Sequence, residues 1–194
     1  DDLTGDVIAV GSLGKEIYYV LYSNGNLLVR GTGEMYDYDL DTNLSPLRGN
    51  SDIQAVVIDE GIVSVGDYVF GNCKNMKNIT LPPSLTSIGQ AAFMQGDNYI
   101  GEVCGLTNIA IPSKVTSISG SAFWGTAIES LVILDSVTEI GKYAFRDCTA
   151  LKKVTINGTV IGEFMFVSCT KLSNFTIGSK LKKIGSNVFN YCSA

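Results

Sequence analysis

Short stretches of alternating apolar and variable residues recur along residues 53–194 at a nearly constant spacing. The six stretches are VVI from Val56, ITL from Ile79, IAI from Ile109, LVI from Leu131, VTI from Val154 and FTI from Phe175. Apolar positions two apart, with many β-branched residues, predict short strands that bury one face. Because no helix-length pattern separates them, the pattern excludes a doubly wound sheet and predicts a solenoid in which each repeat adds one rung.

A second pattern keeps the same period. In six copies an aliphatic residue precedes a phenylalanine by five positions, and these phenylalanines are Phe70, Phe93, Phe123, Phe145, Phe166 and Phe189. Successive phenylalanines are 23, 30, 22, 21 and 23 residues apart, and the long step contains an insertion at 94–105. We expect the phenylalanine to lie in a tight turn, 3₁₀ or a single helical turn. Glycine follows the aliphatic residue in every copy except at Ser119, which predicts unusual dihedral angles there.

The copy at residues 137–156 has the form V-T-x-I-G-x-x-A-F-x-x-C-x-x-L-x-x-V-x-I. It resembles the BspA-like leucine-rich repeats of bacterial secreted and cell-surface proteins, and the resemblance covers residues 53–194. The family's fold is mainly β, within the leucine-rich-repeat α/β solenoid class. The resemblance therefore implies a right-handed solenoid with a parallel sheet, divided into an N-terminal β-hairpin cap (1–52) and six repeats (53–194), the last incomplete.

The front of the chain is predicted to form the cap. Asn24-Gly25 separates two alternating runs, IYYVLY and LLVRG, and this is the strongest short signal for a hairpin. Residues 24–38 followed by Ser45-Pro46 also resemble the segment that precedes such repeats in secreted proteins, where Leu47 replaces the family's usual tryptophan. A hairpin in this place would cover the open edge of the first rung.

The resemblance implies a non-catalytic extracellular or cell-surface binding module that adheres to a protein of a host or neighbouring cell. The alternative is a structural spacer that has no ligand of its own. The polar start of the chain, DDLTGDV, is not a signal peptide. It is the kind of start that a mature secreted protein has once its signal peptide has been removed.

Composition narrows the function further. The chain has no histidine, which excludes Ser-His and Cys-His nucleophile pairs within it, and no cofactor is expected. A glycosidase with two carboxylates is the remaining enzyme alternative, but the repeat offers no paired acids. The net charge of −5 argues against a nucleic-acid partner, and no apolar run reaches the ~20 residues of a membrane helix. Residues 1–139 carry a net charge of −11 and residues 140–194 a net charge of +6. This asymmetry is either random variation on a solvated surface or a device that orients the chain against a partner.

Two groups of side chains resemble sites. Cys73, Cys148, Cys169 and Cys192 each follow the repeat phenylalanine by three positions, and Cys104 lies near the same slot. We expect a column of buried thiols. A disulfide is the alternative, because rungs lie about 4.8 Å apart, a separation that a disulfide can span. The acids of DYDLDTN (37–43) have the every-second-residue spacing of calcium loops. They lack the remaining EF-hand ligands, so a solvated loop is expected and no metal is assigned.

Three surfaces are candidates for contact with a partner. Trp124 is the only tryptophan, and Tyr99 and Ile100 of the insertion are expected to lie over it, either as a local lid or as part of an aromatic anchor. The outward positions of the sheet, which include Val57, Thr80, Val132 and Thr155, form a predicted strip of small residues. The last rung has no evident polar cap, which predicts a contact there and a possible homodimer through the C-terminal edge.

Overall fold

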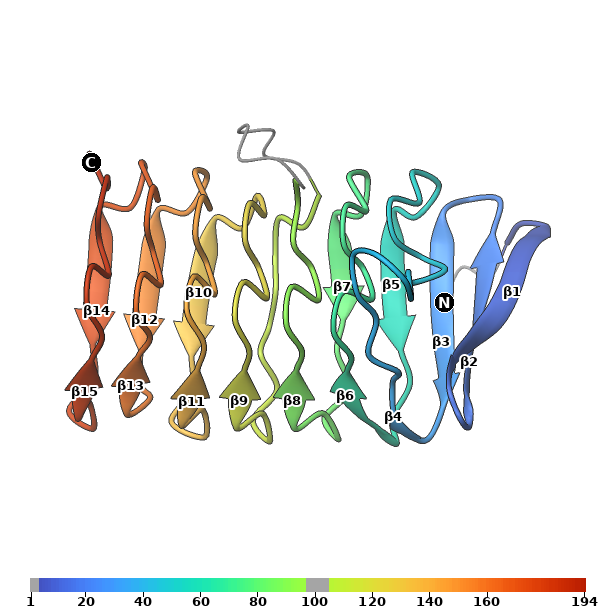
Figure 1. Ribbon diagram of the computed structural model, residues 1–194, viewed down its shortest axis with the longest axis horizontal. Coiled ribbons are helices and arrows are strands. Elements are labelled where there is room, and N and C mark those ends of the chain that lie inside the picture. The colour runs from blue at the N-terminus through green and yellow to red at the C-terminus, as the bar shows by residue number, and fades with distance from the viewer. Residues whose placement is uncertain (1–3, 97–104) are drawn as a thin grey trace.

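The computed structural model describes residues 4–96 and 105–194, and in them the chain forms an elongated solenoid of short strands and turns (Figure 1). No helical segment occurs in those two ranges. The strands of the N-terminal part are β1 (Val7–Gly14), β2 (Ile17–Tyr22), β3 (Asn26–Gly31), β4 (Gly33–Glu34), β5 (Ala55–Ile58), β6 (Ile62–Val65), β7 (Asn78–Thr80) and β8 (Ser87–Ile88). Those of the C-terminal part are β9 (Ser117–Ile118), β10 (Ser130–Ile133), β11 (Glu139–Ile140), β12 (Lys153–Ile156), β13 (Val160–Ile161), β14 (Asn174–Ile177) and β15 (Lys183–Ile184).

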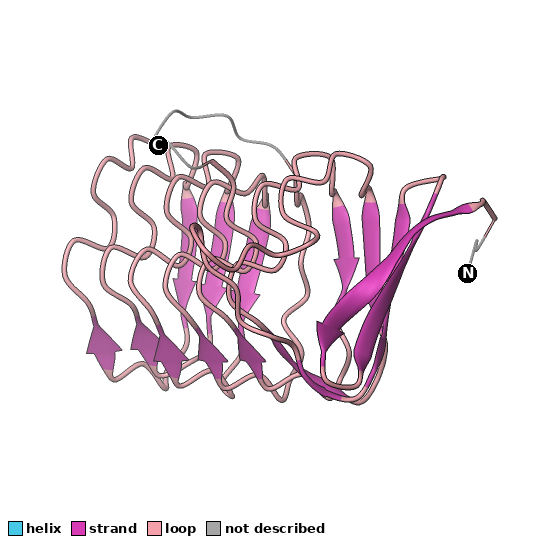
Figure 2. Cartoon of the chain, turned by 45° about the vertical axis from the view of Figure 1, so that its right-hand side comes forward, coloured by secondary structure: helices cyan, strands magenta, loops and turns pink. Residues whose placement is uncertain are grey.

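Most rungs contribute one longer and one shorter strand, and these lie in sheets on two sides of the coil (Figure 2). The longer strands form the order β1-β2-β3-β5-β7 and, separately, β10-β12-β14. The shorter strands form β11-β9-β8-β6-β4 and β13-β15. Pairing between successive rungs is parallel and in register, as in Val132 with Thr155 and Thr155 with Thr176. The predicted mainly β solenoid with parallel sheets is confirmed.

The strand expected at Ile109 is not formed, and this divides the longer-strand face into two sheets. Residues 106–112 have no strand assignment. Beside this segment the rung still makes backbone bonds to its neighbours, from Thr107 N to Lys77 O (3.1 Å) and from Glu129 N to Thr107 O (3.2 Å). This rung follows the long insertion, and Pro112 at its end has no amide proton to donate to a ladder.

The repeat phenylalanines form one stack along the axis of the coil. Ring centroids from Phe70 to Phe166 are 5.4, 5.2, 5.0 and 5.9 Å apart, and Phe189 extends the stack by a further 6.0 Å. The first five rings are fully buried, whereas Phe189 in the last rung is 44% exposed. The core is therefore a continuous column of rings that is buried along the first five copies and exposed at the last one.

The turn around each phenylalanine is not the 3₁₀ or helical turn that the sequence suggested. The residue two before the phenylalanine has a left-handed backbone in all six copies, although none of these residues is glycine: Tyr68, Ala91, Ser121, Tyr143, Phe164 and Asn187, with φ between 49° and 61°. This conformation interrupts any run of helical bonds. It costs about 1–2 kcal/mol for an ordinary residue, and it points the amide at the next rung, as in Tyr68 N to Gln90 O (2.9 Å).

The glycine that recurs after the aliphatic residue is needed for a reason other than the unusual dihedral angles that the sequence suggested. Gly66, Gly89, Gly141, Gly162 and Gly185 do not have positive φ. They are required because successive rungs approach closely at this point. A Cβ on Gly89 would lie 2.6 Å from the backbone carbon of Gly66, and one on Gly162 would lie 2.8 Å from Ile140 O.

The N-terminal strands join the solenoid directly. β1 pairs with β2 and β2 with β3 in antiparallel fashion, and the predicted turn at Asn24-Gly25 connects β2 to β3. β3 then pairs in parallel with β5, and β4 pairs in parallel with β6. The second strand of the hairpin is therefore also the first rung of the parallel sheet, so the hairpin continues the sheet instead of lying across its end.

Candidate functional site

An aliphatic row crosses the outward face of the N-terminal sheet. Register pairs Val10 with Val20, Val20 with Leu28, and Leu28 with Val57. Val57 then pairs with Thr80 of β7. The row follows from the alternation in β1, β2 and β3, because the residues on either side of these positions point into the core. Four adjacent strands thus present apolar side chains side by side on a surface that faces solvent.

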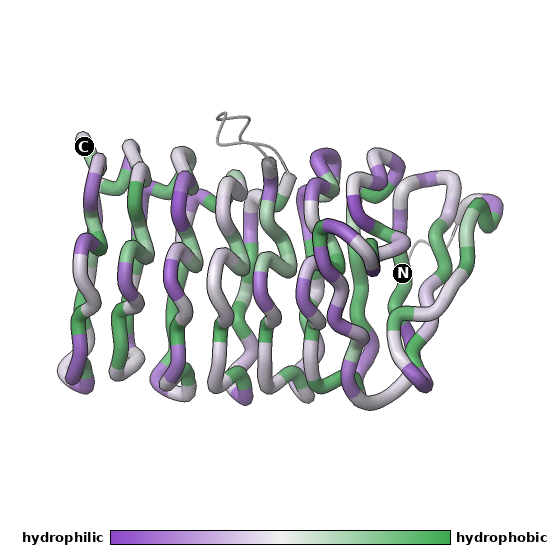
Figure 3. The backbone as a smooth tube through the Cα atoms, viewed as in Figure 1, coloured by the Kyte–Doolittle hydropathy of each residue, from purple (hydrophilic) through white to green (hydrophobic). Residues whose placement is uncertain are grey.

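This row is the centre of a larger exposed patch. Val10 is 66% exposed, Ile8 49% and Tyr18 51%, and Val57 is 39% exposed at the other end. Leu28, at 7% exposure, is buried but is not a member of the core cluster. We call Ile8, Val10, Tyr18, Val20, Leu28 and Val57 the N-terminal apolar patch. The N-terminal strands are correspondingly rich in apolar residues (Figure 3). Contiguous exposed patches of this kind mark interaction surfaces in soluble proteins.

The C-terminal part of the same face is more polar. Val132, 48% exposed, pairs with Thr155, which pairs with Thr176. Lys153 and Asn174 lie beside them on neighbouring strands. Val57 and Thr80 are thus brought together, as are Val132 and Thr155, but the unpaired rung at residues 106–112 lies between the two pairs. The single uniform strip that the sequence suggested is two surfaces of different character.

Trp124 is half-buried and held by its neighbours on the next rung. Its Nε1 donates a hydrogen bond to Asp147 Oδ2 (2.7 Å), and the Arg146 guanidinium lies 4.6 Å from the centre of its ring. Arg146 also contacts Asp147 through Nε (3.2 Å). Tyr99 and Ile100, which were expected to lie over Trp124, fall outside the described residues.

Trp124 belongs to a row of aromatic side chains on the turn side of the coil. Tyr143 lies 6.2 Å from Trp124, and Phe164 lies 5.0 Å from Tyr143. Arg146 packs over Tyr143 as well, at 5.3 Å. Sequence reasoning missed Tyr143 and Phe164, although both occupy the variable position two before the repeat phenylalanine. Aligning the six copies at that position would have revealed them.

The cysteines do not form a reactive site or a disulfide among the described residues. Each thiol donates to a backbone carbonyl of the preceding rung, as in Cys148 to Phe123 O (3.3 Å) and Cys169 to Phe145 O (3.2 Å). Burial raises the pKa of Cys73 to about 12. The hydrogen bond with Cys148, together with burial, raises the pKa of Cys169. Cys73 and Cys169 are therefore neutral at ordinary pH, and a neutral thiol is a poor nucleophile. Cys104 falls outside the described residues.

The acidic loop is organised around one carboxylate. Asp39 accepts hydrogen bonds from the backbone amides of Asp41 (2.8 Å), Thr42 (2.7 Å) and Asn43 (2.9 Å). The bonds from Asn43 and Asp41 contribute most to lowering its pKa to about 2. Its lone pairs are used within the loop, so they are not presented to a cation. Within residues 4–96 and 105–194 no group of three or more possible metal ligands occurs.

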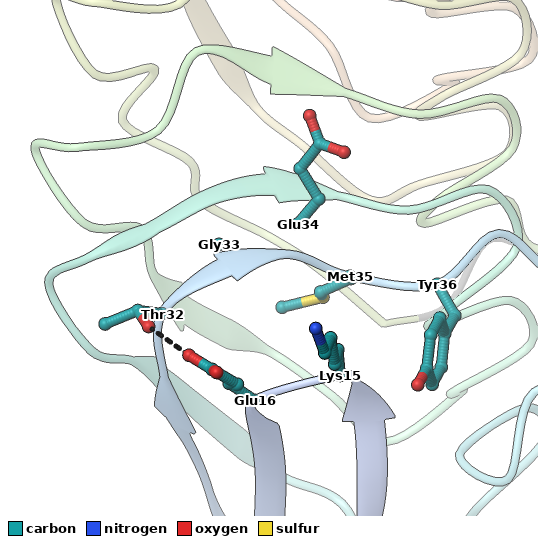
Figure 4. Close-up of a pocket in the computed structure, with 7 residues that line it drawn as sticks. All are labelled: Lys15, Glu16, Thr32, Gly33, Glu34, Met35 and Tyr36. Carbon is teal, nitrogen blue, oxygen red and sulfur yellow. Dashed lines mark hydrogen bonds between the residues drawn. The ribbon is translucent and has the colours of Figure 1, made fainter.

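An open cleft of about 520 Å³ lies within the N-terminal segment, between the β1–β2 turn and β4. It is lined by Lys15, Glu16, Thr32, Gly33, Glu34, Met35 and Tyr36 (Figure 4). Among these side chains the drawn hydrogen bond joins Thr32 Oγ1 to Glu16 Oε2 (3.4 Å). Charged groups of both signs surround a buried Met35, and no nucleophile with a neighbouring base is present in the lining.

Comparison with known families identifies the repeat. The family described as BspA type leucine rich repeat region matches residues 48–99 and 98–194, in six copies. The chain belongs to this family. No curated protein matches the chain.

The chain is similar to solved structures of leucine-rich-repeat proteins, of which one with a TM-score above 0.5 shows the shared fold. A T. pallidum leucine-rich-repeat protein is 20% identical over 92% of this chain and 87% of its own, with a TM-score of 0.63. One from Eubacterium ventriosum is 18% identical over 98% and 96%, with a TM-score of 0.42. A leucine-rich cell surface protein from Faecalibacterium prausnitzii is 16% identical over 96% and 81%, with a TM-score of 0.25.

Most of the positions that recur among the six copies have a structural role in the BspA-type repeat. Phenylalanine, thiol and glycine columns serve packing and rung-to-rung contact, and Thr126 takes the thiol's place in one rung, where its Oγ1 bonds to Phe123 O (2.9 Å). In the described ranges no helix has the length and apolar character needed to cross a membrane. The surfaces that remain for function are the ones that vary among the copies.

Proposed function

We propose that this BspA-type chain is a non-catalytic extracellular or cell-surface module that binds a protein through the outward face of its longer strands. The observation that supports this is the N-terminal apolar patch. A folded repeat protein gains nothing in stability from leaving Val10 66% and Tyr18 51% exposed. Apolar and tyrosine side chains on a rigid sheet are typical of the centre of a protein interface.

The proposed partner is a protein of a host or of a neighbouring cell, with no nucleic acid, cofactor or membrane insertion involved. The alternative is a spacer that holds other domains apart and binds nothing. The two differ in whether the patch has a partner. The proposal also treats residues 1–52 as the cap of a repeat array at 53–194, with the patch spanning the junction between them.

A pull-down from host extracellular matrix tests the proposal. Val57→Lys places a charge at one end of the N-terminal apolar patch, where the residue is 39% exposed, so folding is expected to be retained. Val132→Lys is the matched control, since it makes the same change at a residue 48% exposed on the other sheet. We expect Val57→Lys to lose the captured protein and Val132→Lys to keep it. Equal capture by both variants would contradict the assignment to the patch, and no capture by wild type would favour the spacer.

The aromatic row is a second candidate surface. Trp124, Tyr143 and Phe164 lie on three successive rungs with Arg146 over two of their rings. Aromatic and arginine side chains are enriched at the centres of interfaces. We propose Trp124 as its anchor, with Tyr99 and Ile100 of the insertion beside it. Trp124→Ala in the same pull-down tests this surface independently of Val57→Lys.

The C-terminal edge is a third proposed contact, in which a second copy would cover the last rung. Ile177, Ile184 and Phe189 are 49%, 59% and 44% exposed there. Ile184→Lys should then abolish self-association in sedimentation experiments, and an unchanged molecular mass would count against this contact.

A further inference from the structure

An open cleft of about 580 Å³ lies along the shorter strands, on the other side of the coil from the longer strands (Figure 2). It reaches from Gln90 in the second repeat to Lys183 in the sixth. Adjacent rungs lie about 4.8 Å apart, so these four steps extend over roughly 19 Å. The middle is lined by Ser117, Ser119, Gly120, Thr138 and Glu139, which belong to β9, β11 and the residues beside them. We call this surface the shorter-strand cleft.

Gly120, in the middle of this cleft, is required neither by the backbone nor by packing. The other five copies carry a side chain at the corresponding position, two residues after the aliphatic one: Asp67, Gln90, Lys142, Glu163 and Ser186. Gly120 does not have positive φ, and a Cβ on it would lie 3.4 Å from Lys142 O, which is ordinary contact. Glycine makes an ordered segment less stable than alanine does. Its presence here therefore indicates that something outside the chain approaches the backbone closely.

The polar side chains of the cleft have hydrogen-bonding capacity to spare. Ser119 stands where every other copy has glycine, so this repeat adds a hydroxyl to the lining. Among the described residues, the side chains of Ser117, Ser119 and Glu139 make no hydrogen bond or ion pair. Glu139 is exposed, and the two serines are half-buried. Two hydroxyls and a carboxylate are therefore available to a ligand that lies over Gly120.

The lining also indicates the chemistry of that ligand. Glu139 and Lys183 are the charged residues of the lining, and their opposite signs leave it without a net charge. The serine and threonine hydroxyls and the Gln90 amide both donate and accept hydrogen bonds. A carboxylate accepts only, and the hydrogen bonds that it accepts are roughly twice as strong as neutral ones. This combination matches an uncharged molecule that carries many hydroxyl groups.

We propose that the shorter-strand cleft binds a neutral oligosaccharide. One sugar ring lies against the backbone of Gly120, and its hydroxyl groups bond to Glu139, Ser117 and Ser119. An extended peptide matches the cleft less well, because peptides bind a sheet through a free strand edge, and β9 is already paired with β8 and β11. The inference does not depend on the proposed protein partner, which binds the outward face of the longer strands on the other side of the coil.

Isothermal titration calorimetry of the full chain with three neutral tetrasaccharides, chitotetraose, maltotetraose and lacto-N-tetraose, tests the proposal. We expect at least one of them to bind with a dissociation constant below about 1 mM. Gly120→Gln places in the cleft the side chain that the second copy carries, and it should weaken this binding at least about tenfold by occupying the space of the sugar ring. Glu139→Gln removes the charged acceptor and should weaken binding about tenfold.

Ser186→Gln is the matched control, because it introduces the same side chain at the corresponding position of the sixth repeat, which does not line the cleft. Ser186→Gln and Val57→Lys should both leave the dissociation constant within about twofold of wild type, and thermal melts check that every variant is folded. The absence of binding below about 1 mM for all three tetrasaccharides would overturn the proposal. So would equal binding by Gly120→Gln and Ser186→Gln, or a blocked hexapeptide of serine and alanine that binds in place of the sugars and is lost in Gly120→Gln.

Discussion

The stack of phenylalanines makes a quantitative prediction about stability, best tested at Phe145. This ring is fully buried and lies between Phe123 at 5.0 Å and Phe166 at 5.9 Å. Phe145→Ala removes the ring from a column that the rungs on either side hold in place, so the surrounding structure cannot collapse into the gap. Truncation of a buried phenylalanine costs about 3–5 kcal/mol, and a rigid site lies toward the upper end.

Phe189 provides the internal comparison, since it has the same role at the end of the stack. It is 44% exposed, with Phe166 at 6.0 Å on one side and Phe175 edge-on at 4.9 Å. About half of the transfer free energy is therefore absent, and little cavity remains after truncation. We expect Phe189→Ala to cost about 1–2 kcal/mol. The two variants should thus differ by about 2 kcal/mol or more.

Urea denaturation followed by circular dichroism and by Trp124 fluorescence measures both variants. Wild type and variants should unfold with the same dependence on denaturant, so that a shift in midpoint reports a change in stability. A cost for Phe145→Ala below about 1 kcal/mol would refute the stacked core. Equal costs for Phe145→Ala and Phe189→Ala would refute the argument that neighbouring rungs set the magnitude.

Three further predictions rest on individual contacts. Gly89→Ala should destabilise the chain by about 2 kcal/mol or more in thermal melts, because its Cβ would lie 2.6 Å from the Gly66 backbone. Gly120→Ala, with 3.4 Å to Lys142 O, should change stability by less than about 0.5 kcal/mol. Asp39, with its pKa lowered to about 2, should contribute stability above its unfolded pKa and lose it as pH falls toward 2; NMR titration gives the midpoint, and Asp39→Asn should remove this dependence. Peptide mapping after thiol labelling of folded protein should find Cys192 modified before Cys73, Cys148 and Cys169, since these three are buried.

The period of the repeat could be predicted from the sequence, because the same packing recurs in each copy. The phenylalanines from Phe70 to Phe189 occupy one position in the coil. Because this position must fill the same space in each rung, the same residue type recurs there. The hairpin at Asn24-Gly25 was readable for a similar reason, since its turn needs a specific backbone. Both signals are local, and both are confirmed.

The backbone conformation of the turn could not be predicted from residue type. Glycine suggested positive φ at Gly89, but the left-handed residue is Ala91 two positions later. Tyrosine, serine, phenylalanine and asparagine occupy that position in the other copies. In the first five copies the amide of this residue bonds to the next rung, a contact between residues more than twenty positions apart that single-residue preferences do not report.

The apolar patch was missed because it depends on pairing between strands that only the fold determines. The alternation in β1 and β2 predicts which residues share a face, but not that Val10 lies beside Val20, or that Leu28 lies beside Val57. The sequence placed Val57 and Val132 in one strip on the assumption of an unbroken sheet. The unpaired rung at residues 106–112 separates them, and the apolar surface extends toward the cap instead.

The repeats and the cap differ in the residues that they place on the outward face of the sheet. Along the repeats, the outward position holds a small polar residue at Thr80 and Thr155 and a single valine at Val57 and Val132. In the cap the corresponding position is Val10, Val20 or Leu28, and Tyr18 lies beside them, although β1 and β2 gain no core contacts from these side chains. Stability alone would favour threonine or lysine at the exposed positions of an edge. The proposed protein partner on the outward face would cover these aliphatic and tyrosine side chains.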